Sequence, residues 1–359
     1  MSRYPVGPAL LAVPFVLPQV LILDWLYPGW EQETPYRCLG MAKNAAAAIV
    51  ALLGVALFKL LRMVGLGRMA LPTVFAAALG SNLWTVASQS LWQHGPAALA
   101  LTLSVILLLP RTVSRTRLCL AGLTTGALVW FRSVDIIFWV AICLWVIRHH
   151  PRGLAWFLPF PIVGAGTLIG CNYWLFGTIV GGQSQLEALH PAVHGVEGAW
   201  SGKLLDGSLG TLVSPSHGLF VFTPWVALAL ACLPAVAPRF RTWPLLVWLM
   251  WAILPYFWVN SNYSIWWGGH CFGPRYWIDV VPLFAVLLGF SLQWSHTRCR
   301  PVFLTLLSAV VFSLGVQLIG AFCYPSSWET SPADADQHHE RLWDWRDNEL
   351  SRCLQEGIK

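Results

Sequence analysis

The sequence predicts an all-α, polytopic membrane protein, on three observations. Hydrophobic residues make up 57% of the 359 residues and charged residues only 11%, whereas a soluble domain carries about 25% charged residues. The mean hydropathy is +0.61. Apolar runs recur along nearly the whole chain. We therefore expect one membrane-embedded helical bundle in the lipid bilayer, and the formal net charge of +6 requires no nucleic-acid partner.

Ten apolar runs are long enough, or nearly long enough, to span a bilayer, which takes about 20 residues. They cover residues 44–61, 70–84, 96–109, 118–130, 134–147, 154–176, 219–236, 244–259, 278–292 and 302–320. An earlier run, residues 7–25, is interrupted by Pro14 and Pro18 and is expected to lie in the membrane interface or to form a first helix. We expect a bundle of about ten helices over residues 1–320, with residues 1–43 as its interfacial or first-helix segment.

Basic residues are concentrated in alternate loops. Five loops contain twelve of the 22 Lys and Arg residues and none of the 16 acidic residues; the basic residues are Lys59, Arg62, Arg68, Arg111, Arg115, Arg117, Arg148, Arg152, Arg239, Arg241, Arg298 and Arg300. The positive-inside rule places these loops in the cytoplasm. The long loop 177–218 and the tail 321–359 are then expected on the opposite, outer side of the membrane.

Polar side chains cluster in the loops and helix ends expected on that outer side. They include Ser88, Gln89, Gln93, His94, Arg132, Asp135, His190, His194, Glu197, Ser214, Ser216 and His217. The interiors of the predicted helices are almost free of ionisable groups, whereas transporters carry such groups along ion or substrate pathways, with sites near the bilayer midplane. Binding or chemistry at the outer face is therefore favoured over transport through the membrane.

The stretch SNYSIWWGGHCFGPRYW at residues 261–277 lies between two long apolar runs. Trp266 and Trp267 suit a membrane–water interface, where an amphipathic ring contacts both lipid and water. Gly268, Gly269 and Gly273 permit tight turns or close approach to a ligand. An ordinary interfacial loop and a ligand-binding loop are both compatible with these residues.

Arg275 follows Pro274 at an expected helix start. The helix dipole disfavours a cation in this first turn, so a negative partner is expected nearby. Asp279, one turn later, is one candidate for that partner, and a lipid phosphate is the other.

Arg132 and Asp135 occupy a turn too short to leave the membrane surface. A local salt bridge between them would close the turn and contribute little if exposed. Alternatively, Arg132 faces a lipid phosphate, which its planar fork of donors matches.

Other candidate features give weaker signals. His190 and His194 have an i, i+4 spacing, but the neighbouring Pro191 and Gly195 argue against a regular helix, so this is a weak metal site. We predict no metal ligands and no cofactor, although a divalent ion would be compatible with the chemistry. The tail is expected to form a surface helix on the outer face, with His338 and His339 on its solvated side, and four cysteines could pair there in an oxidising compartment: Cys38, Cys271, Cys323 and Cys353.

Four stretches resemble a known family: RYPVGPALLAVPF (3–15), ASQSLWQHGPAALAL (87–101), SPSHGLFVFTP (214–224) and WWGGHCFGPRYWIDVVPL (266–283). They are similar to bacterial type-C integral-membrane glycosyltransferases, relatives of the dolichyl-phosphate-mannose protein mannosyltransferases. The resemblance covers most of the chain in the same order, through loose motifs. It implies a bacterial inner-membrane enzyme that uses a polyprenyl-phosphate-linked sugar donor on the non-cytoplasmic face and a glycan, lipid or protein acceptor.

An inverting transfer requires a carboxylate that accepts the acceptor's proton and cations that stabilise the departing phosphate. Asp24 and Asp135 are the candidate catalytic acids. Three acidic residues of the long loop are alternative candidates for the catalytic acid: Glu187, Glu197 and Asp206. The candidate substrate-binding residues are Gln93, His94, Arg132, His217, Trp266, His270 and Arg275.

The chain departs from the family pattern at three places. His217 stands where family members carry Arg, and His270 where they carry an aromatic residue. The family begins with a spanning helix and an outer loop with a catalytic acid, ahead of the stretch that starts here at Tyr4. We expect these parts to be missing, so the chain would be a truncated or inactive relative that binds lipid phosphate; alternatively, residues 7–25 replace them and Asp24 supplies the acid. A non-enzymatic lipid or glycan transporter is a further alternative.

Overall fold

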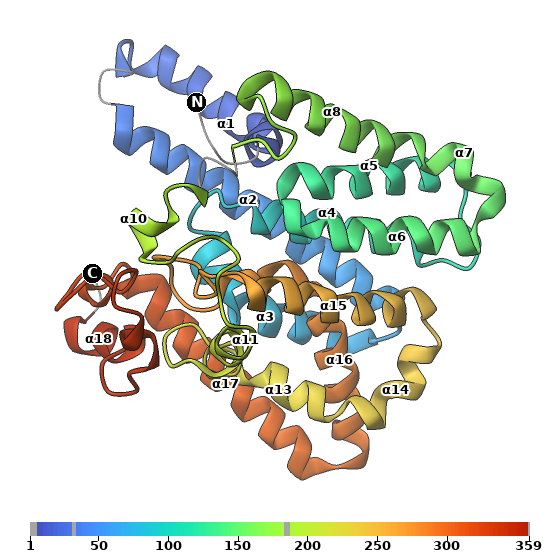
Figure 1. Ribbon diagram of the computed structural model, residues 1–359. Coiled ribbons are helices and arrows are strands. Elements are labelled where there is room, and N and C mark those ends of the chain that lie inside the picture. Colours follow the sequence, from blue (N-terminus) through green and yellow to red (C-terminus); the bar gives the residue numbers. More distant parts are fainter. Residues whose placement is uncertain (1–5, 31–33, 183–186, 358–359) are drawn as a thin grey trace.

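The computed structural model describes residues 6–30, 34–182 and 187–357, and within these ranges the chain is helical and forms no strand (Figure 1). Within the same ranges, five helical segments are long and apolar enough to cross a membrane. They are α1 (Gly7–Leu26), α2 (Thr34–Met63), α15 (Pro244–Asn262), α16 (Val281–Arg298, with the 3-10 turn before it) and α17 (Arg300–Cys323). Their length and composition make the chain a multi-pass membrane protein. The predicted total of about ten spans stays a prediction.

Other predicted spans correspond to shorter helices. These are α3 (Ala70–Leu79), α4 (His94–Leu108), α5 (Arg115–Phe131), α6 (Ile136–His149), α8 (Pro159–Phe176), α13 (Pro224–Ala231) and α14 (Leu233–Arg241). The segment Ser133–His149 and the following Pro151–Phe157, which contains α7 (Leu154–Phe157), would make a sixth span as a pair, but they meet at an angle of 109°.

The run 7–25 forms one continuous helix, α1, with Pro14 and Pro18 inside it. A proline removes one backbone hydrogen bond from a helix interior, and the apolar surroundings of a membrane favour keeping all the others. The two prolines therefore do not interrupt α1. Only 6% of its span is buried in the protein, so most of this helix lies on the outside of the bundle.

The helices α4 and α16 form the centre of the bundle. Nearly every residue of α4 is buried, and 89% of the span that contains α16 is buried. Helices that are apolar all round belong in such central positions. In contrast, α17 is only 28% buried and presents Leu304, Leu307 and Val311 outward.

The basic loops lie at one end of the molecule, near α7 and α14, on the right of Figure 1. The guanidinium of Arg115 lies 5.2 Å from the ring of Trp156, and Arg239 donates a hydrogen bond of 3.4 Å to the Gly65 carbonyl. The second contact joins two of the five loops that were predicted to be cytoplasmic, and the first joins a third such loop to α7. The short helices α10 (His190–His194) and α18 (Glu349–Glu356) lie at the opposite end.

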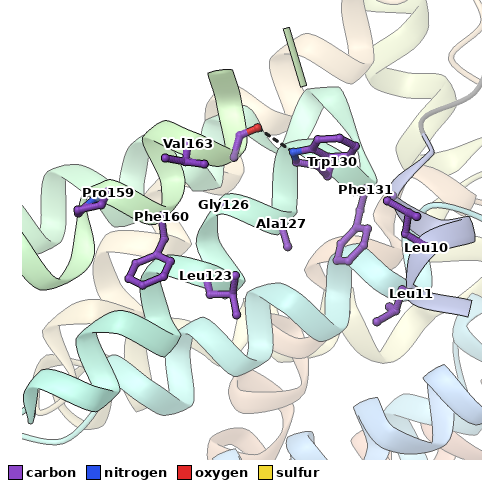
Figure 2. Close-up of a pocket in the computed structure, with 12 residues that line it drawn as sticks. Leu10, Leu11, Leu123, Gly126, Ala127, Trp130, Phe131, Pro159, Phe160 and Val163 are labelled. Atoms are coloured by element: carbon purple, nitrogen blue, oxygen red, sulfur yellow. Dashed lines mark hydrogen bonds between the residues drawn. The ribbon is translucent and has the colours of Figure 1, made fainter. Parts of the chain in front are cut away.

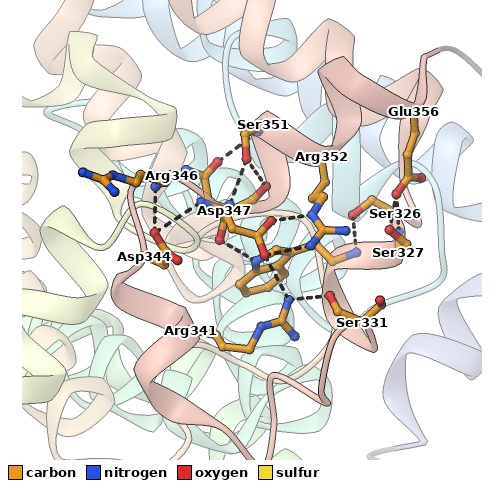
Figure 3. A network of polar contacts seen from close by, with 12 residues as sticks. Ser326, Ser327, Ser331, Arg341, Asp344, Arg346, Asp347, Ser351, Arg352 and Glu356 are labelled. Carbon is orange, nitrogen blue, oxygen red and sulfur yellow. Dashed lines mark hydrogen bonds and ion pairs between the residues drawn. The ribbon is translucent and has the colours of Figure 1, made fainter.

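Residues 324–357 fold into a cap on that opposite end, which we call the outer cap after the side of the membrane on which the sequence predicts it. A disulfide between Cys323 and Cys353 joins the end of α17 to α18; these are two of the four cysteines for which the sequence left pairing open. Within the cap, Arg341 and Arg352 both contact the Asp347 carboxylate, and Arg341 also donates to the Ser331 carbonyl at 2.7 Å (Figure 3). The cap therefore has a polar framework of its own.

Two expectations for this end were wrong. Trp266 and Trp267 are 5% and 3% exposed rather than interfacial, because Trp328, Ala335 and Leu342 of the cap pack over them. The tail is also not a single surface helix. It consists of short 3-10 turns followed by α18, since the Pro and Asp residues at 332–336 favour turns over helix.

Candidate functional site

A buried polar cluster lies where α4, α5, α15 and the 3-10 turn before α16 meet. Its centre is Asp279, which is 1% exposed. The Asp279 carboxylate accepts hydrogen bonds from Arg132 and, at 2.8 Å, from the Tyr256 hydroxyl, and its Oδ1 lies 2.9 Å from His94 Nδ1. Three distant segments of the chain thus contact one carboxylate, and we call Asp279, Arg132, Tyr256, His94 and Asn260 the central cluster.

Arg132 reaches this cluster because α5 ends at Phe131 and the backbone of Arg132 is extended, with φ of −150°. Its guanidinium donates to the Tyr256 hydroxyl and, at 3.2 Å, to Asn260 Oδ1, and it lies 5.2 Å from the Tyr276 ring. Its ion-pair partner is Asp279. The local Arg132–Asp135 salt bridge considered from the sequence is therefore not what fixes this arginine.

Asp135 lies beside the central cluster in the 3-10 turn Ser133–Asp135 and is 1% exposed. Neither of its carboxylate oxygens accepts a hydrogen bond from the part of the chain that the structure describes. Within the same ranges His94 Nε2 also lacks a partner. Buried polar atoms without partners are rare in folded proteins and indicate a water molecule, a proton or a ligand. Asp135 and His94 Nε2 are therefore the atoms of this region where a water molecule, a proton or a ligand is expected.

Arg275 opens the 3-10 turn Arg275–Val280 directly after Pro274. Its half-buried guanidinium lies 4.7 Å from the Trp92 ring and 5.5 Å from the Tyr276 ring. Arg132 also contacts Tyr276, so one aromatic ring adjoins both arginines. The candidate internal partner of Arg275, Asp279, is ion-paired with Arg132. Gln93, also half-buried, immediately precedes His94 at the start of α4.

The other predicted substrate-binding residues lie under or against the outer cap. His217 is buried, its Nε2 donates to the Cys271 carbonyl at 3.1 Å, and burial lowers its pKa to about 3. It is therefore neutral at physiological pH and cannot supply a positive charge to a phosphate. Trp266 packs between Trp343 and the backbone at Gly210. His270 contacts Asp334 of the cap at 3.1 Å.

The candidate acid Asp24 lies near the end of α1 and is exposed. It accepts a hydrogen bond of 2.6 Å from Trp30 Nε1. No contact in the described part of the chain joins it to the central cluster. Of the two predicted catalytic acids, the structure thus places only Asp135 beside Arg132.

An apolar groove of about 610 Å³ lies between α1, α5 and α8 (Figure 2). Its lining includes Leu10, Leu123, Gly126, Trp130, Phe160 and Gly164. Glycines allow α5 and α8 to approach closely: a Cβ at Gly164 would lie 3.1 Å from the Gly126 carbonyl oxygen, and Trp130 Nε1 donates to the Gly164 carbonyl at 2.7 Å. The groove reaches Trp130 and Phe131, the two residues that precede Arg132.

No family model, curated protein or solved structure matches the chain.

Sequence reasoning missed Tyr256 and Asn260, and it considered Asp279 only as a partner for Arg275. One signal could have identified the first two. Tyr256 and Asn260 are spaced i, i+4 in an otherwise apolar span, and polar residues on one face of a membrane helix point to a bundle interior.

Proposed function

We propose that the chain is a membrane glycosyltransferase-like protein that binds a polyprenyl-phosphate-linked sugar on the non-cytoplasmic side. The observation that carries this proposal is the apolar groove that reaches Trp130 and Phe131, directly before Arg132. A prenyl chain requires an apolar surface open to lipid, and its phosphate requires cations at the end of that surface.

The two arginines have different roles in this proposal. Arg132 is already neutralised by Asp279, so it holds the cluster together and contributes hydrogen-bond donors. Arg275 is half-buried against Trp92 and Tyr276, and a planar guanidinium matches the geometry of a phosphate. We assign Arg275 as the phosphate ligand, because the charge of Arg132 is already balanced by Asp279.

The proton of the acceptor hydroxyl requires a base. Asp135 and His94 Nε2 are buried beside Arg132 and accept no hydrogen bond within the described residues. Asp279 would orient His94 through its Nδ1, as carboxylates orient catalytic imidazoles. A base within hydrogen-bond reach of the substrate typically contributes about 10²–10⁴-fold to the rate.

Binding without transfer is the second candidate, because Asp279 is fully engaged by Arg132, Tyr256 and His94. It corresponds to the inactive or truncated relative considered from the sequence. No observation on the described residues favours a transporter.

The proposal can be tested by a substitution that fills the apolar groove with a larger side chain. Leu123 lines it and is 57% exposed, whereas Leu120 on the same helix is 45% exposed and does not line it. With the protein in lipid vesicles, Leu123→Trp should weaken binding of a fluorescent polyprenyl phosphate at least about tenfold, and Leu120→Trp should bind like the unmodified protein. Transfer from a radiolabelled polyprenyl-phosphate hexose then separates an enzyme from a binding protein. Equal binding by both variants would contradict the proposal.

A further inference from the structure

Three segments of the chain bring metal-ligating side chains together at the outer cap, apart from the central cluster. His194 ends α10 in the long loop, His270 lies in the stretch 261–277, and Asp334 and Asp336 belong to the cap. One ligand atom from each of His270, Asp334 and Asp336 lies within 4.8 Å of the others. His194 Nδ1 lies 2.9 Å from Asp336 Oδ2.

The spacing of these atoms fits a tetrahedral ion. Nitrogen and oxygen ligands lie about 2.0–2.2 Å from Zn²⁺, so the edges of the tetrahedron are roughly 3.3–3.6 Å long. His270 Nε2 lies 3.1 Å from Asp334 Oδ1 and 3.7 Å from Asp336 Oδ2. Small side-chain shifts would bring these three atoms to one centre, and His194, in contact with Asp336, is the fourth candidate ligand.

His194 adds a second imidazole beside this group. Its Nδ1 lies 2.9 Å from Asp336 Oδ2, close enough for a hydrogen bond or ion pair between the imidazole and the carboxylate. The same carboxylate oxygen therefore lies between two imidazoles, 2.9 Å from His194 Nδ1 and 3.7 Å from His270 Nε2. His194 would then bind through Nδ1 and His270 through Nε2.

Surrounding contacts hold the four side chains in place without a metal. Trp267 Nε1 donates to Asp336 Oδ1 at 2.6 Å, which leaves Oδ2 facing the two histidines. The amide of Gln337 donates to the Ala192 and Val193 carbonyls at 3.0 and 2.8 Å and so joins the cap to α10. Hydrogen bonds that orient ligands in this way typically change metal affinity by about 10–100-fold.

We propose that His194, His270, Asp334 and Asp336 bind one divalent transition-metal ion that fastens the outer cap to the long loop and to the stretch 261–277. Two imidazoles and two carboxylates neutralise a divalent charge, and imidazole favours Zn²⁺ over Mg²⁺ or Ca²⁺. The side chains of His270 and Asp334 are 36% and 45% exposed, which gives an ion access from solvent. This role is separate from the proposed sugar transfer, and it assigns His270 to a metal rather than to a lipid phosphate.

The test uses full-length protein in detergent, treated with chelator and titrated with Zn²⁺. The unmodified protein should bind one ion per chain, with a rise in Tm, and Co²⁺ in its place should give the absorption bands of a tetrahedral site. His270→Ala and Asp334→Asn change exposed side chains, so they should fold normally and lose at least about tenfold in affinity.

His338→Ala is the matched control. His338 is an exposed histidine of the same cap, 3.2 Å from Glu340, with no third ligand among the described residues. This variant should bind Zn²⁺ like the unmodified protein. Failure to bind one ion per chain, or equal affinity in His270→Ala, Asp334→Asn and His338→Ala, would overturn the proposal. Loss of lipid-phosphate binding with intact Zn²⁺ binding would count only against the proposed function.

Discussion

Arg132 and Asp279 form a buried ion pair, although 147 residues separate them in the sequence. The pair joins the end of α5 to the start of α16. Taking two charges out of water is expensive, and it is compensated only when both groups make further hydrogen bonds. Tyr256 and Asn260 supply such bonds from α15, so the pair depends on the packing of three helices.

Removing one partner of this pair should be strongly destabilising. We expect Arg132→Met or Asp279→Leu alone to lower the free energy of unfolding by about 3–5 kcal/mol, because each leaves an uncompensated buried charge. The double variant should recover part of the loss. Arg68→Gln, an exposed basic residue, should change stability by no more than about 0.5 kcal/mol. Chemical unfolding in detergent measures all four, and additive losses in the double variant would show that the two charges do not interact.

The central cluster illustrates what the sequence could and could not predict. Composition predicts a helical membrane protein, since few other classes of protein have so few charged residues. The distribution of basic residues predicts which loops lie together at each end of the bundle. The partner of Arg132 could not be predicted, because Asp135 is near in sequence whereas Asp279 is near only after α5, α15 and α16 pack. For the same reason the sequence favoured Trp266 at an interface, when the cap that buries it lies more than 60 residues later.

Stability of the outer cap should fall as pH rises, through Glu349. This carboxyl is buried, and burial together with repulsion from Glu329 raises its pKa well above the usual range, although the Gly273 amide donates to it at 3.1 Å. Above the pKa of the unfolded state, about 4.3, the unfolded chain loses this proton while the folded chain keeps it. The contribution of protonated Glu349 to the free energy of unfolding is therefore fully present below that pH. It is lost as pH rises towards the folded-state pKa, by about 1.4 kcal/mol per pH unit.

Thermal unfolding of the unmodified protein and of Glu349→Gln between pH 5 and 8 checks this. Other groups titrate in the same range, including His217, whose lowered pKa acts in the opposite direction below pH 6.5. The difference between the two proteins isolates Glu349. The stability of Glu349→Gln relative to the unmodified protein should increase as pH rises. A difference that stays constant with pH would show that Glu349 ionises equally in the folded and unfolded states.

The disulfide should hold the cap in place. Cys323 and Cys353 are 30 residues apart in sequence, and closing a loop of that length stabilises a fold by roughly 3–4 kcal/mol in the chain-entropy model. Replacing both with Ser should make residues 324–357 far more susceptible to limited proteolysis, with the membrane helices resistant. Cys38→Ser, which removes an exposed free thiol, should leave the cleavage pattern unchanged.

The cap should be accessible from outside the cell. In a Cys38→Ser background, Trp345→Cys places a thiol at a position that is 63% exposed, and a membrane-impermeant maleimide should label it in intact cells. Arg68→Cys, in a predicted cytoplasmic loop, should be labelled only after lysis. The reverse pattern would invert the topology inferred from the basic loops and place the disulfide in a reducing compartment, where such bonds are rare.

Substitutions at Arg275 and Asp279 should have different effects, because the two side chains belong to different interactions. Asp279 is the centre of the buried cluster, so Asp279→Asn should mainly lower stability. Arg275 stacks on Trp92 and Tyr276, contacts that are individually worth about 0.5–2 kcal/mol. Under the proposed function, Arg275→Gln should weaken polyprenyl-phosphate binding by about tenfold to a hundredfold, since a hydrogen bond to a charged group contributes about 1.5–3 kcal/mol.

Arg275→Lys tests whether phosphate binding depends on the shape of the guanidinium as well as on its charge. Lysine keeps the charge but replaces a planar fork of donors with a single ammonium, so binding should recover only in part. Thermal stability and lipid-phosphate binding, measured on Arg275→Gln, Arg275→Lys and Asp279→Asn, separate a role in the site from a role in the fold. If Arg275→Gln bound the lipid phosphate as tightly as the unmodified protein, the phosphate would have to be held by other groups, and Arg275 would serve only to pack Trp92 against Tyr276.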